Sequence, residues 1–317
     1  MKTVLLTRIA RLIATLLAVS FITFVMVSLL PGDAIDVLLP PDAPRTPEVL
    51  DQLKAEYRLD DPVLVRYFDW LGDAVRGDLG QSFISDQAVS DIIKDRIPIT
   101  AELALLATLI ALVLALPIGI IGAFREGRPA DKVTGIAAQV GLSVPNFIVA
   151  IFAIWLFTIQ WQLFPSSGWN RLSEKGLVEN LKSAILPSIT LALAPMAIYS
   201  RLLRADMINV LKEDYVLSAK AKGLKTNYIL VRHALRPSSL SLMTVVGIQI
   251  GALLGGTVVI EQIFAVPGLG RRLIEAINQR DVIVIQGITV FIASIYVIIN
   301  TIVDLLYLVV DPRIRKG

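Results

Sequence analysis

The chain has 317 residues, 55% of them hydrophobic, and its mean hydropathy is +0.69. Soluble domains contain roughly 45 to 50% apolar residues, so this composition indicates a polytopic membrane protein. The lack of cysteine excludes disulfides and thiolate metal sites, and a single histidine provides no cluster for metal catalysis. The formal charge of +3 is small, and its distribution along the chain is more informative than its sum.

Six apolar segments predict six membrane-spanning helices. The first, residues 12–30, is uncharged for 19 residues, which at 1.5 Å per residue spans about 28 Å, close to the roughly 30 Å of a hydrocarbon core. A cleavable signal peptide is the alternative, but its apolar core is usually about 7 to 15 residues long, so we expect a retained helix. The other predicted spans are residues 103–124, 141–163, 183–200, 237–260 and 282–303.

The interval at residues 31–98 is polar and acidic, with 14 Asp and Glu against seven Lys and Arg. Helical spacing of its apolar residues predicts three short helices, near residues 46–57, 62–75 and 89–97. Each has an apolar stripe but no large core, so we expect them to pack on the outer ends of the spans or to meet a partner. The stripe of the second helix consists of Leu64, Tyr67, Phe68, Leu71 and Val75.

The distribution of Lys and Arg predicts that both termini lie in the cytoplasm. Segments on the predicted inner side are basic, with eight Lys and Arg between residues 201 and 236 alone. The short loops on the predicted outer side hold only Arg171, Lys175, Lys182, Arg271, Arg272 and Arg280.

The basic loop at residues 206–236 contains two predicted helices. Residues 215–222 are good helix formers and end at Gly223, the residue type that most easily adopts the left-handed conformation closing a helix. A second helix is predicted to begin with Thr226 as its N-cap. The sequence therefore predicts a short helix across the membrane face, with a turn at Gly223.

The central parts of the predicted spans contain no ionisable residue. A central charge costs roughly 2.5 to 3.5 kcal/mol on insertion scales and is normally retained only for function. This argues against an ion-coupled secondary transporter, whereas a passive pore stays open as an alternative. Asp304, near the inner end of the last span, is expected to have an interfacial role.

Glycines recur in the fifth predicted span, where Gly247, Gly251 and Gly255 are spaced by four. Small residues at this spacing let another helix approach closely. They therefore indicate a subunit contact, a pathway lining, or tight packing within one subunit. Gln249, on a different face, is a candidate for lining a polar passage.

The segment after the fifth span contains a turn and a predicted short helix. Pro267 and Gly268 are a strong turn signal, and Gly270 adds flexibility. Together with Phe264 they are candidates for an outer gate or for contact with a delivery protein, and a plain interfacial turn is the alternative. The amphipathic helix is predicted from Leu273, Ile274 and Ile277.

Prolines inside the predicted spans are expected to kink them, because each removes a backbone donor. Ser143, Asn146 and Ser188 stand close enough to compensate. The prolines are Pro117, Pro145, Pro187 and Pro195.

The basic loop resembles the EAA loop of ABC-transporter permeases. With the family's glycine placed on Gly223, the chain supplies Ala219 at the second alanine and Leu235 at the leucine. The elements DYV, AKAKG and RHALR are similar to the version in the peptide and nickel branch of that family. The chain departs from the general pattern at Leu217, Ser218, His233 and Arg236.

Resemblance to the B-type permeases of dipeptide, oligopeptide and nickel importers extends over nearly the whole chain. It is carried by the segments LLPGD, RLDDPVLVRYFDWLGDAVRGDLGQS, ITAELALLA, GLSVPNF, LFPSSGW, FAVPGLGR and DLLYLVVDPRIR. It implies an all-α type I importer permease with six membrane helices, in the cytoplasmic membrane of a bacterium or archaeon. The implied partners are a homologous C-type permease, two cytoplasmic ABC ATPases and an extracytoplasmic substrate-binding protein.

The resemblance also implies that the helix ending at Gly223 is a coupling helix seated in a groove of an ATPase subunit. Small Ala219 and Ala221 would permit a close seat. The chain would be neither an enzyme nor a binder of metal, cofactor or nucleic acid. ATP and Mg would be bound by the partner subunits, since no G-x-x-x-x-G-K-[ST] loop occurs. The implied coupling residues are Asp214, Tyr215, Ser218, Ala219, Lys220, Ala221, Lys222, Gly223 and Leu224.

The expected organisation is an N-terminus with the first helix (1–30), an extracytoplasmic helical segment (31–98), a permease core (99–310) and a cytoplasmic tail (311–317). Peptides are the favoured substrate, because the absence of Cys and the lone His233 disfavour direct metal capture. Nickel chelates and oligosaccharides are the alternatives. A membrane-anchored enzyme is disfavoured, since no nucleophile, base and orienting group are recognisable.

Overall fold

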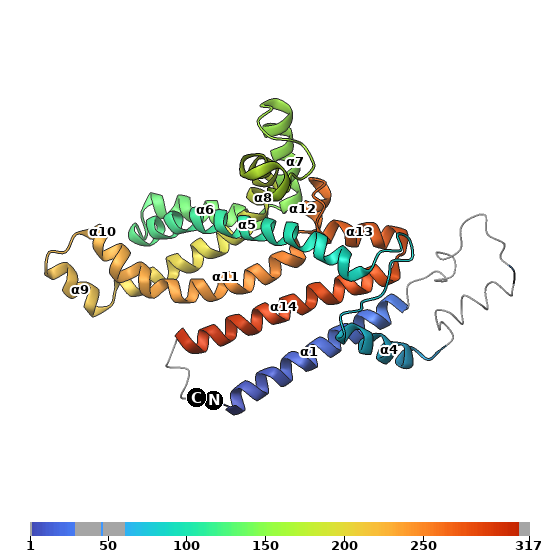
Figure 1. The fold of residues 1–317 in the computed structure, drawn as a ribbon. Helices are drawn as coiled ribbons and strands as arrows, with labels where there is room; N and C mark the ends of the chain where they lie inside the picture. Colours follow the sequence, from blue (N-terminus) through green and yellow to red (C-terminus); the bar gives the residue numbers. More distant parts are fainter. Residues whose placement is uncertain (1, 29–45, 47–60, 311–317) are drawn as a thin grey trace. The chain divides into compact units, whose positions relative to one another are not determined.

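The computed structural model describes residues 2–28, 46 and 61–310, and these parts are almost entirely helical (Figure 1). Within them, the isolated bridge between Gln81 and Ala88 is the only extended pairing. The helix predicted at residues 46–57 falls outside the described residues. The helices, with η1 and η2 π-helical, are α1 (Lys2–Ser28), α4 (Val63–Val75), α5 (Val89–Phe124), α6 (Pro129–Ser143), α7 (Asn146–Ala153), η1 (Ile154–Gln160), α8 (Leu172–Leu211), α9 (Asp214–Ala221), α10 (Thr226–Tyr228), η2 (Ile229–Leu235), α11 (Arg236–Gly256), α12 (Val258–Ile263), α13 (Leu269–Gln279) and α14 (Val282–Val310).

Five stretches of the described helices are long and apolar enough to cross a membrane. They are Ile9–Ser28 in α1, α5, α8, the continuous stretch Thr226–Gly256, and Val282–Val303 in α14. A sixth crossing results when α6 is taken together with α7 and η1, which meet it at an angle of 97°. The prediction of an all-α fold with six membrane helices is therefore confirmed, with a bent pair as the third.

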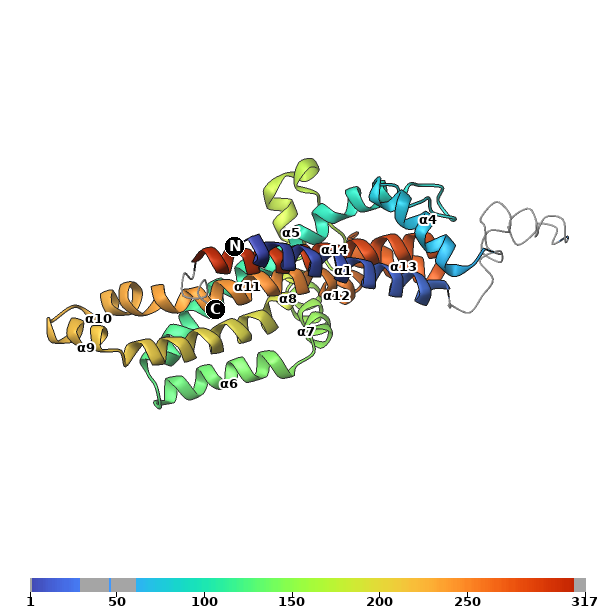
Figure 2. The ribbon, with the colours of Figure 1, turned by 90° about the horizontal axis from the view of Figure 1, so that it is seen from below.

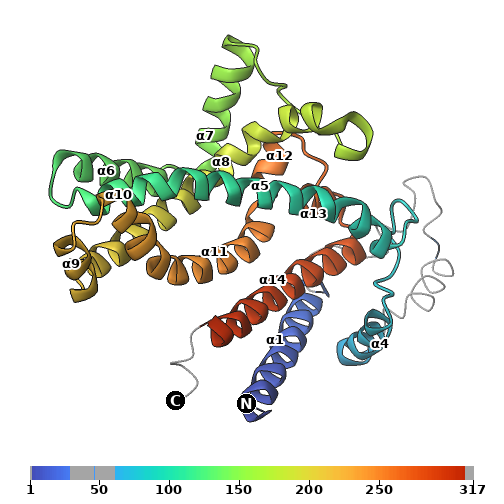
Figure 3. The ribbon, with the colours of Figure 1, turned by 60° about the vertical axis from the view of Figure 1, so that its left-hand side comes forward.

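That bent pair corrects the prediction of one helix at residues 141–163. The chain breaks between α6 and α7, where Val144 is extended (φ −89°, ψ 121°) and Pro145 is the N-cap of α7. Proline disfavours the helical conformation of the residue before it, so the bend falls where the proline pattern predicted a kink. Figure 3 shows α7 turning away from α6.

Helix α5 corrects a second prediction, because it joins two expected helices into one. The helix predicted at residues 89–97 and the span predicted from residue 103 are continuous through Pro98. Val89, Ile92 and Ile93 are buried in a hydrophobic cluster. Their burial outweighs the single backbone hydrogen bond that Pro98 removes.

Helix α8 likewise continues through Pro187 and Pro195, and its residue with non-helical dihedral angles is Gly176 (φ 76°, ψ 173°). The expected compensation by Ser188 is wrong, because the Ser188 hydroxyl has no hydrogen-bond partner. Thr190 instead donates to the carbonyls of Leu186 and Pro187, at 2.9 and 2.8 Å.

The chain forms two compact units, each with its own core. The first comprises residues 1–100 and 267–298, and the second comprises residues 101–266 and 299–317. In the first unit, contacts between buried polar side chains join the turn before α5 to the junction of α13 and α14. Ser82 Oγ donates to Asp281 Oδ2 at 2.5 Å, and Arg272 Nη2 lies 3.6 Å from the same oxygen.

The first unit also holds α4 against α1. Tyr67 is buried, with its hydroxyl 2.9 Å from Ser20 Oγ and 3.3 Å from the Leu17 carbonyl, and its ring contacts Phe21 and Phe24 edge-on. At 1.5 Å per residue, Leu17 and Ser20 lie about 12 Å or more from either end of the span Ile9–Ser28. Helix α4 therefore reaches the middle of α1, instead of packing on its outer end as predicted.

The predicted apolar stripe of α4 is divided into a covered edge and an exposed edge. Tyr67 faces α1, whereas Leu64, Phe68 and Val75 are exposed, Val75 by 80%. The division arises because the aromatic ring and hydroxyl of Tyr67 find partners on α1 that a purely aliphatic stripe would not select.

In the second unit, α8 lies between α6 and α11 and also contacts α7 (Figure 2). Tyr199, Leu203 and Met207 of α8 are fully buried in one cluster with Ala111 and Ala115 of α5. Small side chains allow membrane helices to approach closely, and here they do so within one chain.

Replacing Gly247 with alanine is expected to destabilise the second unit by about 1 to 3 kcal/mol, the usual cost of overpacking. A Cβ at Gly247 would overlap the side chain of Val303, so α11 and the end of α14 are in close contact at this point. Unfolding of the purified chain by SDS, followed by circular dichroism, measures the loss.

The matched control is Gly256→Ala, because a Cβ there meets nothing within 4 Å. It is expected to be neutral or slightly stabilising, since alanine favours helix over glycine. Equal losses for the two variants would contradict the proposed contact, and Val303→Ala is expected to restore Gly247→Ala.

Candidate functional site

The predicted short helix of the basic loop is α9, which begins at Asp214 and ends at Ala221, with Lys222 as its C-cap. Gly223 follows with φ +77°, the left-handed conformation predicted for it. The turn is closed by the amide of Gly223, which donates to the Lys220 carbonyl at 3.0 Å, and by that of Leu224, which donates to Ala219 at 3.3 Å.

The second helix of the loop begins one residue away from its prediction. Lys225 is the N-cap of α10, with extended dihedral angles (φ −61°, ψ 139°), and Thr226 is already helical. The side chain of Lys225 makes no capping hydrogen bond. The prediction of Thr226 as N-cap is therefore wrong. It relied on the preference of threonine for N-cap positions, whereas the turn after Gly223 determines at which residue the helix begins.

One face of α9 packs against other helices of its own subunit. Val216 and Ala219 are buried with Ile229 of η2, and Val210 and Leu211 at the end of α8 complete this small cluster. Ala219 is therefore covered by its own chain, and its predicted contact with a partner stays a prediction.

The opposite face of α9 is exposed. It presents Leu217, which is 50% exposed, together with Ser218, Ala221 and Lys222, and Asp214 at its start. Of the two small residues expected to permit close docking, Ala221 remains available. An exposed leucine beside an alanine is a surface on which another helix or groove can pack.

Tyr215 ties α9 to the following π-helical segment. Its hydroxyl donates to the His233 carbonyl at 3.2 Å. Burial, and next the negative charge of Glu213, raises the pKa of the Tyr215 hydroxyl. A tyrosine hydroxyl is neutral at physiological pH, and this shift further favours the neutral form that donates.

Charged contacts at the ends of α5, α6 and α8 support this loop, and no sequence pattern indicated them. Arg204 of α8 binds Asp131 of α6 through two hydrogen bonds of 2.5 and 2.7 Å. The amide of Gly127 donates to the same carboxylate at 2.9 Å. Lys212, at the end of α8, pairs with Glu126 at 3.2 Å. These contacts join the turn after α5 to the helix that leads into α9.

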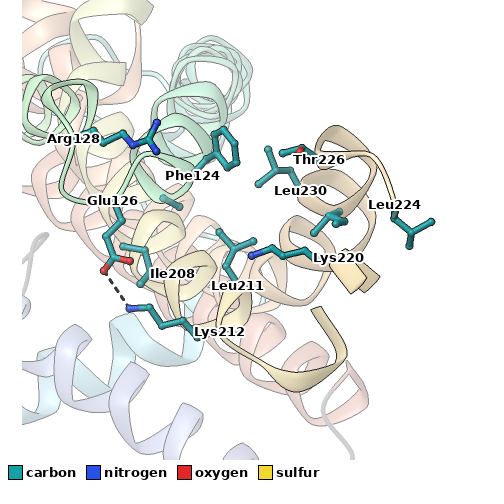
Figure 4. A pocket seen from close by; sticks show the side chains of 12 residues that line it. Phe124, Glu126, Arg128, Ile208, Leu211, Lys212, Lys220, Leu224, Thr226 and Leu230 are labelled. Atoms are coloured by element: carbon teal, nitrogen blue, oxygen red, sulfur yellow. Dashed lines mark hydrogen bonds and ion pairs between the residues drawn. The ribbon is translucent and has the colours of Figure 1, made fainter. Parts of the chain in front are cut away.

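A pocket of about 550 Å³ separates that turn from α9 and α10 (Figure 4). Lys220 extends into it from one wall, and Arg128 stands on the opposite wall, close to Phe124. The Glu126–Lys212 pair borders the pocket below. The lining consists of Ala123, Phe124, Glu126, Arg128, Ile208, Leu211, Lys212, Lys220, Leu224, Thr226, Ile229 and Leu230.

The glycines of α11 do not form one uniform surface. Gly247 packs on Val303, Gly251 is buried and Gly255 is exposed. Gln249 is half-buried. Packing inside the subunit therefore accounts for Gly247, whereas a pathway or subunit contact at Gly255 and Gln249 stays a prediction.

The residues predicted for an outer gate are mostly buried. Phe264 follows α12, and its carbonyl accepts a hydrogen bond from the Gly168 amide at 3.0 Å. Gly268 is the N-cap of α13, and Gly270 is buried in the first turn of that helix, so it adds no flexibility there. The predicted helix exists, but its buried side carries Leu269, Arg272 and Ala276, and Ile277 is exposed. A gating or binding role stays a prediction.

The described helices contain no group of three or more His, Asp or Glu placed to hold a metal ion. Together the long apolar helices define the chain as a multi-span membrane protein. Residues 115–316 match the family model "Binding-protein-dependent transport system inner membrane component", and residues 1–104 match its N-terminal companion, "Binding-prot-dependent transport system membrane comp, N-term". The chain belongs to this family of transporter permeases.

The curated relatives that the chain matches are permeases of peptide transport systems, in agreement with its resemblance to the dipeptide, oligopeptide and nickel importer permeases. A putative peptide transport system permease protein of Brucella abortus (strain 2308) is 39% identical over 315 residues, 99% of each chain. The dipeptide transport system permease protein DppB of Bacillus subtilis (strain 168) is 37% identical over 303 residues, covering 95% of this chain and 94% of that protein. The oligopeptide transport system permease protein AppB of the same organism is 36% identical over 305 residues, 96% of each.

Proposed function

We propose that this chain is the membrane-spanning subunit of an ATP-driven importer for peptides. It forms the translocation pathway with a second homologous permease, receives substrate from an extracytoplasmic binding protein, and is driven by two cytoplasmic ATPase subunits. The peptide substrate is supported by the names of the relatives, which are permeases of peptide, dipeptide and oligopeptide transport systems.

The observation that carries the proposal is the arrangement of α9. One face is fixed by burial of Val216 and Ala219, whereas Leu217 and Ala221 are exposed on the other. A helix that packs firmly on its own subunit and exposes apolar side chains, here Leu217 and Ala221, can transmit the movement of a partner that binds them. The ATPase seats on this exposed face, which lies in the cytoplasm together with both termini.

Transport then proceeds by alternating access. ATP binding draws the two ATPases together, each ATPase moves the α9 it holds, and the pathway between the permeases changes its open side. The permease supplies two packings of similar free energy, and its partners bias the balance between them. ATP and Mg are bound by the ATPases.

Reconstitution in liposomes tests the proposal. Uptake of a labelled peptide is expected only when this chain is combined with its homologous permease, both ATPases, the binding protein and ATP. Equal uptake by the chain alone would contradict the proposal and would indicate a passive pore.

A further inference from the structure

The pocket beside α9 has an unbalanced charge. Lys212 and Glu126 lie 3.2 Å apart and neutralise each other. Arg128 and Lys220 also line the pocket, and neither makes an ion pair within the described part of the chain. With one anion and three cations in its lining, the pocket carries a net charge of +2.

The rest of the lining is mostly apolar and continuous with the membrane-embedded surface. Phe124 ends the spanning helix α5 and is 51% exposed, and Ile121, one turn earlier, is 45% exposed. Ile208 and Leu230 add apolar surface from α8 and η2. Figure 4 shows Phe124 on the same side of the opening as Arg128, and Leu230 across from Arg128 beside Thr226. The pocket thus combines two cations with an apolar surface at the ends of membrane helices.

The pocket is separate from the proposed ATPase surface. Lys220 is the α9 residue that lines the pocket and points into it, whereas Leu217 and Ala221 are exposed and do not line it. A ligand in the pocket would therefore contact α9 without covering the exposed face.

We propose that this pocket binds the headgroup of an anionic phospholipid. Arg128 and Lys220 pair with the phosphate from opposite walls, and an acyl chain lies along Phe124 toward the membrane. Basic pockets between membrane helices on the cytoplasmic side are suited to such headgroups. A free phosphate ion would use the two cations but not the apolar surface, which is why the lipid is the favoured occupant. The bound lipid links α9 to the turn after α5.

Native mass spectrometry of the full-length chain in a mild detergent tests this site. The probes are phosphatidylglycerol and phosphatidylcholine with identical acyl chains. Phosphatidylglycerol is expected to be retained preferentially, and Arg128→Gln or Lys220→Gln is expected to weaken its binding about fivefold each, the loss of about 1 kcal/mol per cation. The double variant is expected to bind the two lipids alike.

The matched controls are Arg125→Gln and Lys222→Gln, which remove the same charges from the same turn and the same loop but do not line the pocket. They are expected to bind phosphatidylglycerol as the wild type does. Equal losses in controls and pocket variants would overturn the site in favour of unspecific attraction. Displacement of the lipid by inorganic phosphate at equal concentration would overturn the lipid assignment. All four side chains are exposed, so folding is retained, as circular dichroism can verify.

Discussion

Asp131→Ala is expected to be the most destabilising single substitution where the turn after α5 meets α6 and α8. It leaves the Arg204 guanidinium without the two hydrogen bonds of 2.5 and 2.7 Å that now balance its charge. It also removes the acceptor of the Gly127 amide. Breaking a buried ion pair costs roughly 3 to 5 kcal/mol. The lower end applies here, because the Arg204 side chain is 34% exposed and that of Asp131 is 10% exposed. SDS unfolding of the purified chain measures the change.

Two further variants separate the ion pair from general damage. Glu126→Ala removes a carboxylate from an exposed pair with Lys212 and is expected to cost at most about 1 kcal/mol. The double variant Asp131→Leu with Arg204→Leu leaves no unpaired charge and is expected to be more stable than Asp131→Ala. If Asp131→Ala is no worse than Glu126→Ala, the pair contributes little to stability.

Ala221→Trp is expected to reduce ATP-driven uptake at least tenfold while leaving the chain folded. Ala221 lies on the exposed face of α9, so the indole meets no group of its own subunit but obstructs the proposed ATPase seat. A loss of about 1.4 kcal/mol in docking already weakens binding tenfold. Uptake by the reconstituted importer and retention of the ATPases in pull-down assays are the two measurements.

Lys132→Trp is the control, because it places the same side chain at an exposed position on α6 instead of α9. It is expected to retain both uptake and bound ATPase. Normal ATPase binding and normal uptake by Ala221→Trp would contradict docking on this face. This result can be distinguished from failure of the lipid proposal, which depends on Arg128 and Lys220.

Local sequence signals were sufficient to predict where glycine and proline turn or bend the chain. Gly223 adopts the left-handed conformation that its position after a run of helix formers predicts, and Pro145 marks the bend between α6 and α7. The turn at Pro267 and Gly268, which precedes α13, was predicted for the same reason. Glycine and proline act on the backbone at their own positions, so their effects are visible without knowledge of the fold.

Features that depend on distant residues could not be predicted. Asp131 and Arg204 are 73 positions apart, and no sequence pattern connects them. The inward orientation of Ala219 depends on Ile229, and the continuity of α5 through Pro98 depends on the burial of Ile92 and Ile93. In each case a contact made elsewhere in the chain outweighs the local preference.

The hydroxyl of Tyr67 forms its hydrogen bonds near the middle of the span Ile9–Ser28 in α1. The charged side chains of α4 and its anchoring tyrosine belong to one rigid helix of 13 residues. A protein that binds those charges from the aqueous side therefore pulls directly on the interior of a membrane helix, with no flexible linker between them to absorb the displacement.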